Sequence, residues 1–533
     1  MVILTPNATQ VPVRIVGSSI FGRHPIISDE RTWNMYISDN WLLNFSGYSP
    51  AVNILSIGNE GRGLFHSTRG NFLLAVIGSN IYRIDQNLGF RFLLSIGTST
   101  GDVFMDENLS SQIVIIDGNA KAYIYNYSVG VDFVAPINYT GTPQNFIPNY
   151  VTYQNTYFIF GNALTSHSGS QWYVYESGYD NSGVATTAFD LHFVQVLTLQ
   201  TKPDFAKAAI RIPGHGNYLL VLGNIVGELW SNTGGLQVYE RNASINIDYG
   251  VASVATIATM DDMIVWLGIN EKSSPAIMVM QGGQAERLST DGIDELLSHV
   301  DRPDSSTALF YREDGHIFYI LTFFHELDNF SIMYDFTTKK FFDLTDWDFS
   351  YHPARQIAYF ANEIFFISLK QGSLMRMSTD IPTISTSIEN IYEIPRIRIC
   401  NTYRLPASDR FIVNQFSFTI ENGVEQNVDF QFECEGFIIG EVSGLTMFSE
   451  DDEPLLIEGG SCQIYKPRID VTCSKNGGET YGNAISYFMH STGNYKNQPR
   501  FNKLGEANQF TIQMRFWGFG GFVVQDGFLE VYQ

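Results

Sequence analysis

Acidic residues beside short apolar segments are the first candidates for chemistry in this sequence. Asp117, Asp262 and Glu363 each adjoin such a segment. Two carboxylates that face one pocket can cleave a glycosidic bond, one as the acid and the other as the base or nucleophile. The three residues share no recurring motif, however, so the sequence assigns none of them a catalytic role.

Other polar features are better explained by turns and surface loops. His215 lies in a Pro-Gly-His-Gly-Asn turn without an evident catalytic partner. Asp261 and Asp262 are adjacent, so in a strand they would lie on opposite faces, and a turn is expected instead. The acidic run at residues 450–453 lacks the spaced ligands and the glycine of a calcium loop. We therefore predict no enzyme activity, no catalytic residue, no cofactor and no metal site.

The four cysteines are Cys400, Cys434, Cys462 and Cys473. None forms a Cys-x-x-Cys pair, so neither a zinc ribbon nor a redox motif is predicted. All four lie in strand-like surroundings, where a free cysteine is commonly a small buried thiol. A disulfide would require an oxidising compartment, and the N-terminal residues do not form a signal peptide. Reduced, buried thiols are therefore expected.

Three phenylalanine pairs offer two interpretations. They are Phe323–Phe324, Phe341–Phe342 and Phe365–Phe366. Paired aromatic rings can form a platform for a sugar, but they also fill cores and domain interfaces. Packing within the core is the favoured interpretation.

A repeated pair of short strands must position all these residues. An apolar first segment starts near residues 72, 112, 156, 217, 262, 316 and 363, and each is followed by a break and a second segment. The first segments are nearly continuous apolar runs, as expected for strands that are buried on both faces. A period of about 40–50 residues is typical of a four-stranded propeller blade. The sequence therefore predicts an all-β fold with a β-propeller of six or seven blades.

The flanks and the longest intervals complete the expected domain organisation. Residues 1–50 are expected to form an N-terminal arm with entry strands, and residues 51–385 the propeller, with insertions near 163–216 and 270–316. The second insertion contains the one clear helix pattern, at residues 289–301, with Ser289 or Thr290 as its cap. Alternating strands after Pro395 predict a C-terminal antiparallel β-sandwich over residues 386–533, with a protruding insertion near 440–461.

Composition limits the classes of partner. The chain of 533 residues has 55 acidic and 32 basic residues, a net charge of −23, and 16% charged residues. Tight nucleic-acid binding requires clustered Lys and Arg, and no such run occurs. Low charge with 14% aromatic residues fits either surface hidden in an assembly or a large β-sheet interior. No run of about 18 apolar residues is present, so no membrane span is predicted.

Several segments, taken in order, resemble one protein family. In the N-terminal part they are Asn34-Met35-Tyr36, Ser46-Gly47-Tyr48-Ser49-Pro50, Gly61-Arg62-Gly63-Leu64, residues 71–78 and Ile81-Tyr82-Arg83. Residues 227–235 and 286–297 follow in the middle, and residues 473–485, 499–518 and 527–531 at the C-terminal end. These segments resemble the packaged-DNA stabilisation proteins, the tail hub or nozzle subunits of short-tailed bacteriophages. The chain is longer than the family pattern at 163–216 and 440–461.

That resemblance implies a structural protein of the virion tail with no catalytic residues. It implies a homo-oligomeric ring, expected to be a hexamer, beneath the portal and its adaptor proteins, made in the host cytoplasm. Tail fibres or spikes would dock at the periphery, and a plug or needle would close the channel until ejection. DNA would pass through the lumen without specific binding, and acidic residues that face the lumen would favour that passage.

Two alternatives from other classes remain open at this point. A propeller that binds or cleaves glycans for receptor recognition would need paired carboxylates at a central pocket. A host-type protein-interaction propeller would be expected to carry WD or kelch signatures, which the sequence lacks.

Overall fold

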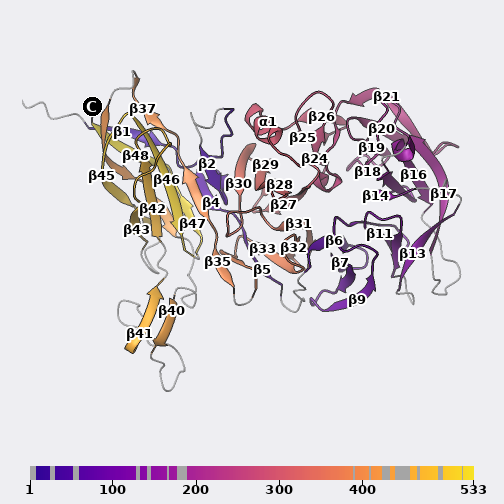
Figure 1. Ribbon diagram of the computed structural model, residues 1–533, viewed down its shortest axis with the longest axis horizontal. Helices are drawn as coiled ribbons and strands as arrows, with labels where there is room; N and C mark the ends of the chain where they lie inside the picture. Colours follow the sequence, from indigo (N-terminus) through magenta and orange to yellow (C-terminus); the bar gives the residue numbers. More distant parts are fainter. Residues whose placement is uncertain are drawn as a thin grey trace, which may run out of the picture.

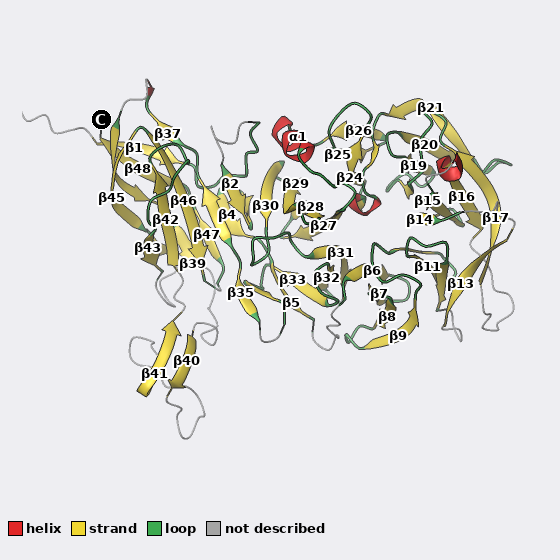
Figure 2. Ribbon diagram, viewed as in Figure 1, coloured by secondary structure: helices red, strands yellow, loops and turns green. Residues whose placement is uncertain are grey.

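A disc of β-sheets and a second group of β-sheets lie side by side in the molecule (Figures 1 and 2). The structure is a computed structural model. It describes residues 8–23, 30–51, 59–127, 133–140, 146–164, 167–176, 189–387, 390–406, 410–422, 432–437, 456–464, 468–489, 496–518 and 520–532. None of the helices among these residues is long and apolar enough to cross a membrane.

The disc is a β-propeller of seven blades within the described residues. The innermost strands are β6 (Gly61–Ser67), β10 (Phe104–Glu107), β14 (Pro148–Gln154), β18 (Ala208–Arg211), β23 (Ala258–Met260), β27 (Ser306–Glu313) and β31 (Ala354–Phe360). The second strands are β7 (Phe72–Ile77), β11 (Gln112–Ile116), β15 (Tyr157–Asn162), β19 (Tyr218–Leu222), β24 (Met263–Ile269), β28 (His316–Phe324) and β32 (Glu363–Ser368). β6 lies against both β10 and β31, so the first and last blades meet.

The outer half of each blade follows the same order. The third strands are β8 (Asn80–Ile84), β12 (Ala122–Asn126), β16 (Gln171–Glu176), β20 (Gly227–Asn232), β25 (Ala276–Gln281), β29 (Asn329–Asp335) and β33 (Leu374–Ser378). The outermost strands are β9 (Phe90–Ser95), β13 (Phe133–Thr140), β17 (Phe189–Thr198), β21 (Tyr239–Ile247), β26 (Gln284–Arg287), β30 (Lys340–Leu344) and β5 (Gly47–Pro50). The fifth sheet also contains β22 (Gly250–Val251).

The seventh blade takes its outermost strand from the other end of the chain. β5 pairs antiparallel with β33, with Tyr48 opposite Met377. β34 (Thr383–Ser385) and β35 (Ile391–Glu393) extend the same sheet. The ring is therefore closed by hydrogen bonds between residues that are far apart in sequence.

Three sheets form the C-terminal part, and strands of the first fifty residues enter all of them. One sheet contains β1 (Ala8–Val13), β48 (Gly527–Tyr532), β38 (Phe411–Ser417) and β45 (Arg500–Ala507). The second contains β2 (Arg31–Trp33), β36 (Arg396–Ile399), β46 (Gln509–Trp517), β42 (Arg468–Ser474), β43 (Ile485–Phe488) and β37 (Tyr403–Arg404). The third contains β3 (Met35–Ser38), β4 (Trp41–Asn44), β47 (Phe522–Val524), β39 (Ile420–Asn422) and β44 (Lys496–Asn497).

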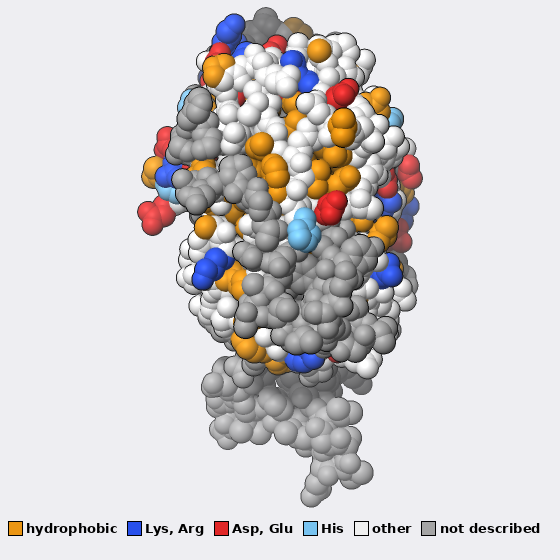
Figure 3. Space-filling view, turned by 90° about the vertical axis from the view of Figure 1, so that its right-hand side faces the viewer, with side chains coloured by type: hydrophobic (Ala, Val, Ile, Leu, Met, Phe, Trp, Pro, Cys, Tyr) orange, Lys and Arg blue, Asp and Glu red, His pale blue; other side chains and the backbone are white. Residues whose placement is uncertain are grey.

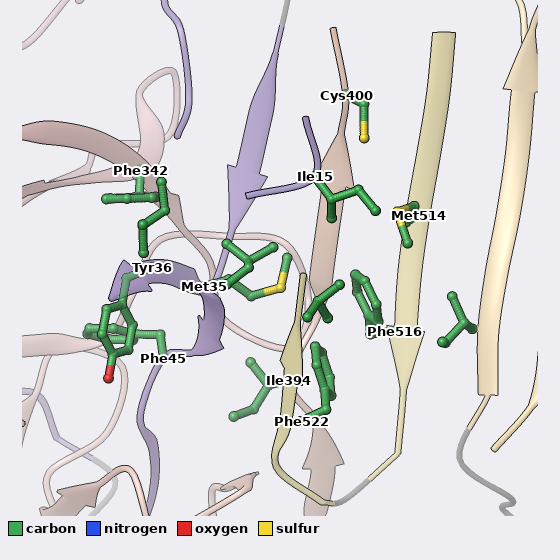
Figure 4. Packing of buried hydrophobic residues seen from close by; sticks show 14 of the residues in the cluster. Ile15, Met35, Tyr36, Phe45, Phe342, Ile394, Cys400, Met514, Phe516 and Phe522 are labelled. Carbon is green, nitrogen blue, oxygen red and sulfur yellow. The ribbon is translucent and has the colours of Figure 1, made fainter. Parts of the chain in front are cut away.

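The sixth blade continues directly into this C-terminal part. β2 pairs parallel with β30, with Trp33 opposite Asp343, and antiparallel with β36. One hydrophobic core crosses the boundary: it joins Phe342 of the sixth blade to Tyr36 and Phe45 of the N-terminal segment and to Met514 and Phe516 of β46 (Figure 4). Because the sheet and the core are both continuous, the two parts form one packed body.

A helix, two 3₁₀ turns and a two-stranded hairpin lie outside these sheets. The helix α1 (Asp291–Ser298) follows β26, with Thr290 as its cap, and buries Ile293 and Leu297. Short 3₁₀ turns lie at η1 (His167–Ser170) and η2 (Val254–Thr256). β40 (Phe432–Phe437) and β41 (Leu456–Ile464) form a two-stranded sheet of their own, which lies apart from the other sheets in Figure 1.

The predicted fold class is confirmed, and the repeated strand pair corresponds to the second and third strands of every blade. β7 is buried along its whole length, as its continuous apolar run predicts. The helix and its cap are confirmed too. The interval 163–216 holds strands β16 to β18 of regular blades, and 270–316 holds β25 to β27 besides the helix. Of the insertion near 440–461, residues 440–455 lie outside the described residues.

Candidate functional site

The candidate carboxylates are placed in three different blades, where each has a local structural role. Asp117 is buried after β11 and accepts hydrogen bonds from the Thr98 hydroxyl at 2.8 Å and the Asn119 N–H at 3.2 Å. Asp262 accepts one from the Gln281 side-chain amide at 2.9 Å. The Glu363 carboxylate pairs with Arg376 at 2.9 Å on the surface.

The turn and loop predictions agree with the structure. Asp261 occupies the left-handed region, with φ of 53°, in the turn between β23 and β24, and its carboxylate pairs with Arg312. His215 is exposed, and its ring centroid lies 6.1 Å from that of Tyr218. The acidic run 450–453 lies outside the described residues.

Five of the six paired phenylalanines belong to the core, as predicted. Phe323, Phe341, Phe342, Phe365 and Phe366 are buried in hydrophobic clusters. The sixth, Phe324, is half-buried under the Arg355 guanidinium, whose central carbon lies 5.8 Å from the ring centroid. None of the three pairs presents a two-ring platform to solvent.

A central cavity of about 770 Å³ lies where the innermost strands converge. Apolar and aromatic side chains form much of its wall, among them Phe65, Phe104 and Met260. Its acidic lining residues, Glu313 and Asp314, are neighbours at the end of β27. Burial raises the pKa of the Glu313 carboxyl. Asp117, Asp262 and Glu363 do not line this cavity, so the pair of carboxylates that glycan cleavage requires is not formed by these candidates.

The connection between the first two blades contains one further sequence motif. Residues 97–101 read Gly-Thr-Ser-Thr-Gly, which matches the letters of a hydrolase nucleophile elbow. That motif needs a strand before it and a helix after it. Here the segment connects β9 to β10, so a strand follows, and Thr98 is bound to the Arg62 guanidinium at 2.8 Å. The segment is a structural loop.

Short motifs that support the resemblance have structural roles in the blades. Arg62 is fully buried and donates to the carbonyls of Gly78, Thr98 and Gly101 at 2.7 to 2.9 Å, which joins the first blade to the β9–β10 connection. Glu228 is fully buried and accepts from the Gln200 and Thr201 N–H groups. Buried charges of this kind require such partners.

The junction between the propeller and the C-terminal sheets contains a network of buried charge. Arg398 is fully buried and donates to the Glu30 carboxylate at 2.7 Å, the Thr32 hydroxyl at 3.0 Å and the Arg14 carbonyl at 3.0 Å. A Cβ on Gly17 would lie 2.1 Å from an Arg398 nitrogen, so the glycine leaves room for the guanidinium.

A second ion pair fixes the same N-terminal segment to the sixth blade. The Arg31 guanidinium donates two hydrogen bonds to the Asp343 carboxylate, at 2.9 and 2.5 Å, and the Ser19 hydroxyl donates a third at 2.5 Å. Two parallel bonds between arginine and a carboxylate constrain both position and angle. The segment before β2 is thus anchored on both sides of the junction.

The closing blade has its own polar cluster. The Tyr48 hydroxyl donates to the Asp346 carboxylate at 2.6 Å, and Lys370 pairs with the same carboxylate. His352 is buried beside them, and its ring stands edge-on to that of Tyr48 at 5.8 Å. Burial lowers the pKa of the His352 imidazole to about 4, so the ring is neutral near pH 7.

Exposed aromatic rings and half-buried arginines lie close together where the seventh blade approaches β46. The Arg515 guanidinium lies 3.5 Å from the Trp517 ring centroid, and that of Arg468 lies 4.9 Å from it. Trp347 is 39% exposed and stacks on Tyr392 at 4.1 Å, and the nearby Phe349 is 48% exposed. The sequence analysis missed this patch, although the alternation along β46 places Arg515 and Trp517 on one face.

Comparison with protein-family models agrees with the propeller fold. A family model described as "Phage_stabilise: Bacteriophage P22 Gp10, beta-propeller" matches residues 31–381. A search of curated proteins found no match. Among solved structures, the WD40 β-propeller domain of Doa1 is 11% identical, with a TM-score of 0.38, over 62% of this chain and 97% of that one. An inactive virginiamycin B lyase from Staphylococcus aureus is 10% identical, with a TM-score of 0.39, over 61% and 98%.

Proposed function

This chain belongs to the Phage_stabilise family of bacteriophage β-propeller proteins, and from that premise we propose that it is the tail hub, or nozzle, of a short-tailed phage virion. In this proposal six copies form a ring beneath the portal and its adaptor proteins. The ring retains packaged DNA, carries tail fibres or spikes at its periphery, and becomes the conduit when a plug or needle leaves.

The observation that carries the proposal is the extent of the family match. Residues 31–381 begin with β2, include the closing strand β5 and run past β33, so they contain strands of all seven blades. The match therefore concerns the whole disc rather than a single repeat. The tail location follows from the family, and the ring and its partners are our extension of it.

The rigidity of the junction supports a mechanical role. A hub must transmit load between a portal and peripheral fibres without changing shape. Here the sixth blade and the C-terminal sheets share a hydrogen-bonded sheet and one core, and Arg398 and Arg31 fix the N-terminal segment between them. A continuous sheet and a shared apolar core limit the relative motion of the two parts.

Two separated apolar surfaces support assembly into a ring. A cyclic ring requires two different surfaces that meet head to tail. One is the patch around Trp347 and Phe349. The other is the far end of the propeller, where hydrophobic side chains gather in Figure 3. Exposed aromatic residues are enriched at protein interfaces.

Electron microscopy of the purified full-length chain, alone and mixed with candidate portal and adaptor proteins, tests the proposal. We expect rings of several copies that bind the adaptor end of the portal. A chain that stays monomeric in every mixture, and that hydrolyses a glycan, would overturn it in favour of a receptor-recognition enzyme. A substitution pair, Trp347→Ala with Phe349→Ala, is expected to reduce ring formation, whereas Tyr359→Ala, at an exposed tyrosine of β31, serves as the control.

A further inference from the structure

The two strands β40 and β41 place two cysteines directly opposite each other. In their antiparallel register Cys434 is the partner of Cys462, between the pairs Glu433–Gln463 and Glu435–Ser461. Directly opposite residues of an antiparallel pair share one face of the sheet. Their Cα atoms are about 4.5 or 5.5 Å apart, depending on the type of pair, and both values fall within the range of a disulfide.

We propose that Cys434 and Cys462 form a disulfide that staples this hairpin once the protein meets an oxidising solution. Such a bond would replace the reduced thiols that the sequence predicts at these two positions. The inference rests on the strand register and does not depend on the proposed function. Only the time of oxidation depends on that function, because a virion leaves the reducing host cytoplasm when the cell lyses.

The hairpin needs such a bond more than the rest of the chain does. β40 and β41 form an isolated two-stranded sheet, and a two-stranded hairpin is at best marginally stable in water. A disulfide between its strands limits the unfolded states of the segment that it closes. Closing the bridge requires the two Cβ atoms to approach by roughly 1 Å relative to an ordinary cross-strand pair.

The reaction is a thiol–disulfide exchange with a small-molecule disulfide such as oxidised glutathione. One cysteine thiolate attacks a glutathione sulfur and releases a glutathione thiolate, which leaves a mixed disulfide. The second thiolate then attacks the protein sulfur of that mixed disulfide and releases the second glutathione. Two electrons pass from the cysteines to glutathione, and the two thiol protons end on the released thiolates.

The other two cysteines form an internal control. The Cys400 N–H donates to the Ile512 carbonyl, and Cys473 is opposite the same Ile512 from the other side of β46. Two strand spacings therefore separate them, about 9.5 Å, which exceeds the reach of a disulfide. Burial raises the pKa of the Cys400 thiol to about 11 and that of Cys473 to about 12, so few thiolates form near pH 7.

Mass spectrometry of the full-length protein tests the bond. After equilibration with oxidised glutathione, alkylation in denaturant is expected to label two thiols per chain instead of four, and digestion is expected to yield a linked Cys434–Cys462 peptide. Cys434→Ser and Cys462→Ser should each abolish that peptide, and Cys400→Ser should leave it intact. Four labelled thiols, or pairing of these cysteines between chains, would overturn the proposal.

Hydrogen exchange gives a second readout. Amides of residues 432–437 and 456–464 are expected to exchange at least about tenfold more slowly in the oxidised protein than in the reduced one. Cys434→Ser should show no such difference. Equal exchange in both redox states would contradict a stapling role even if the bond forms. Ring formation does not enter either measurement, so failure of the tail-hub proposal would leave both results interpretable.

Discussion

The Tyr48 hydroxyl donates a 2.6 Å hydrogen bond to the Asp346 carboxylate, which lies 298 positions later in the chain. Tyr48 belongs to the closing strand β5, and Asp346 to the connection between the sixth and seventh blades. One contact thus joins the start of the propeller to its end. The Ser-Gly-Tyr-Ser-Pro motif of the sequence analysis is this closing strand.

Removal of that hydroxyl is expected to destabilise the closed ring. Tyr48→Phe leaves a buried carboxylate without one donor, so the free energy of unfolding should fall by about 1–3 kcal/mol. Denaturant titration measures the change. Tyr359→Phe, at a tyrosine that is 61% exposed, is the matched control and should be nearly neutral. Equal effects of the two substitutions would contradict a closing role for Tyr48.

Loss of the buried Arg398 guanidinium at the junction should lower the free energy of unfolding more than Tyr48→Phe does. Arg398→Met leaves the Glu30 carboxylate without its buried cation partner, with the more exposed Arg14 still paired to it, and breaking a buried pair typically costs about 3–5 kcal/mol. Arg410→Met removes a surface partner of Glu506 and should cost less than about 1 kcal/mol. The double variant Arg398→Met with Glu30→Gln should recover part of the loss. A single variant as stable as Arg410→Met would argue against the junction network.

The stability of the seventh blade should depend on the protonation of His352. Burial depresses the folded-state pKa of this imidazole to about 4, whereas the unfolded value is about 6.5. Folding therefore favours the neutral ring, and this contribution is fully present above pH 6.5 and lost as the pH falls toward 4. The loss amounts to about 3 kcal/mol by linkage. His352→Phe should flatten this part of the stability–pH curve, and an unchanged slope would contradict the assignment.

A glycine in the helix α1 should resist replacement by alanine. Helix propensity alone predicts that Gly292→Ala stabilises the protein by about 1 kcal/mol. However, a Cβ at this position would lie 1.6 Å from the Phe21 carbonyl oxygen, so we expect a loss of about 1–3 kcal/mol through overpacking. Thermal unfolding checks the sign. Gly89→Ala, where nothing lies within 4 Å of the new Cβ, is the control.

Weak affinity for DNA is expected in spite of the proposed conduit role. A chain with a net charge of −23 lacks the clustered cations that displace counterions from phosphates. Duplex DNA should therefore migrate unchanged in a gel-shift assay even at about 50 mM salt. A retarded band that disappears as salt increases would show a basic surface and contradict an acidic lumen.

Local patterns in the sequence predict the second and third strands of the blades well, because those strands are apolar on both faces. The innermost strands are harder to predict. β10 is a four-residue strand whose side chains are all half-buried, so neither an apolar run nor a clear alternation marks it. Burial beside a cavity, rather than between two sheets, removes the signal on which pattern recognition depends.

The N-terminal strands and the buried arginines illustrate a different limit. β1 pairs with β48, and β2 with both β30 and β36, and no local pattern in residues 8–33 specifies such distant partners. In the sequence, Arg398 looks like an ordinary surface residue of a short alternating strand. Its burial becomes evident only in the structure, where Glu30 and Thr32 contact it. Likewise, the spacing of the cysteines in the sequence does not show that Cys434 and Cys462 lie opposite each other. That relationship follows from the register of β40 and β41.

The pairing of β1 with β48 also sets an order for biosynthesis. The Val16 N–H donates to the Asp526 carboxylate, 510 positions later, so ribosomes moving at 5–20 residues per second need roughly 25–100 s to supply the partner. During that interval β1 must remain soluble without its partner strand β48. A chain that stops short of β48 leaves β1 and β38 with open edges, which are sites for proteolysis or aggregation. This sheet therefore cannot close until β48 has been synthesised, and chains truncated before β48 are expected to be less stable than the full-length chain.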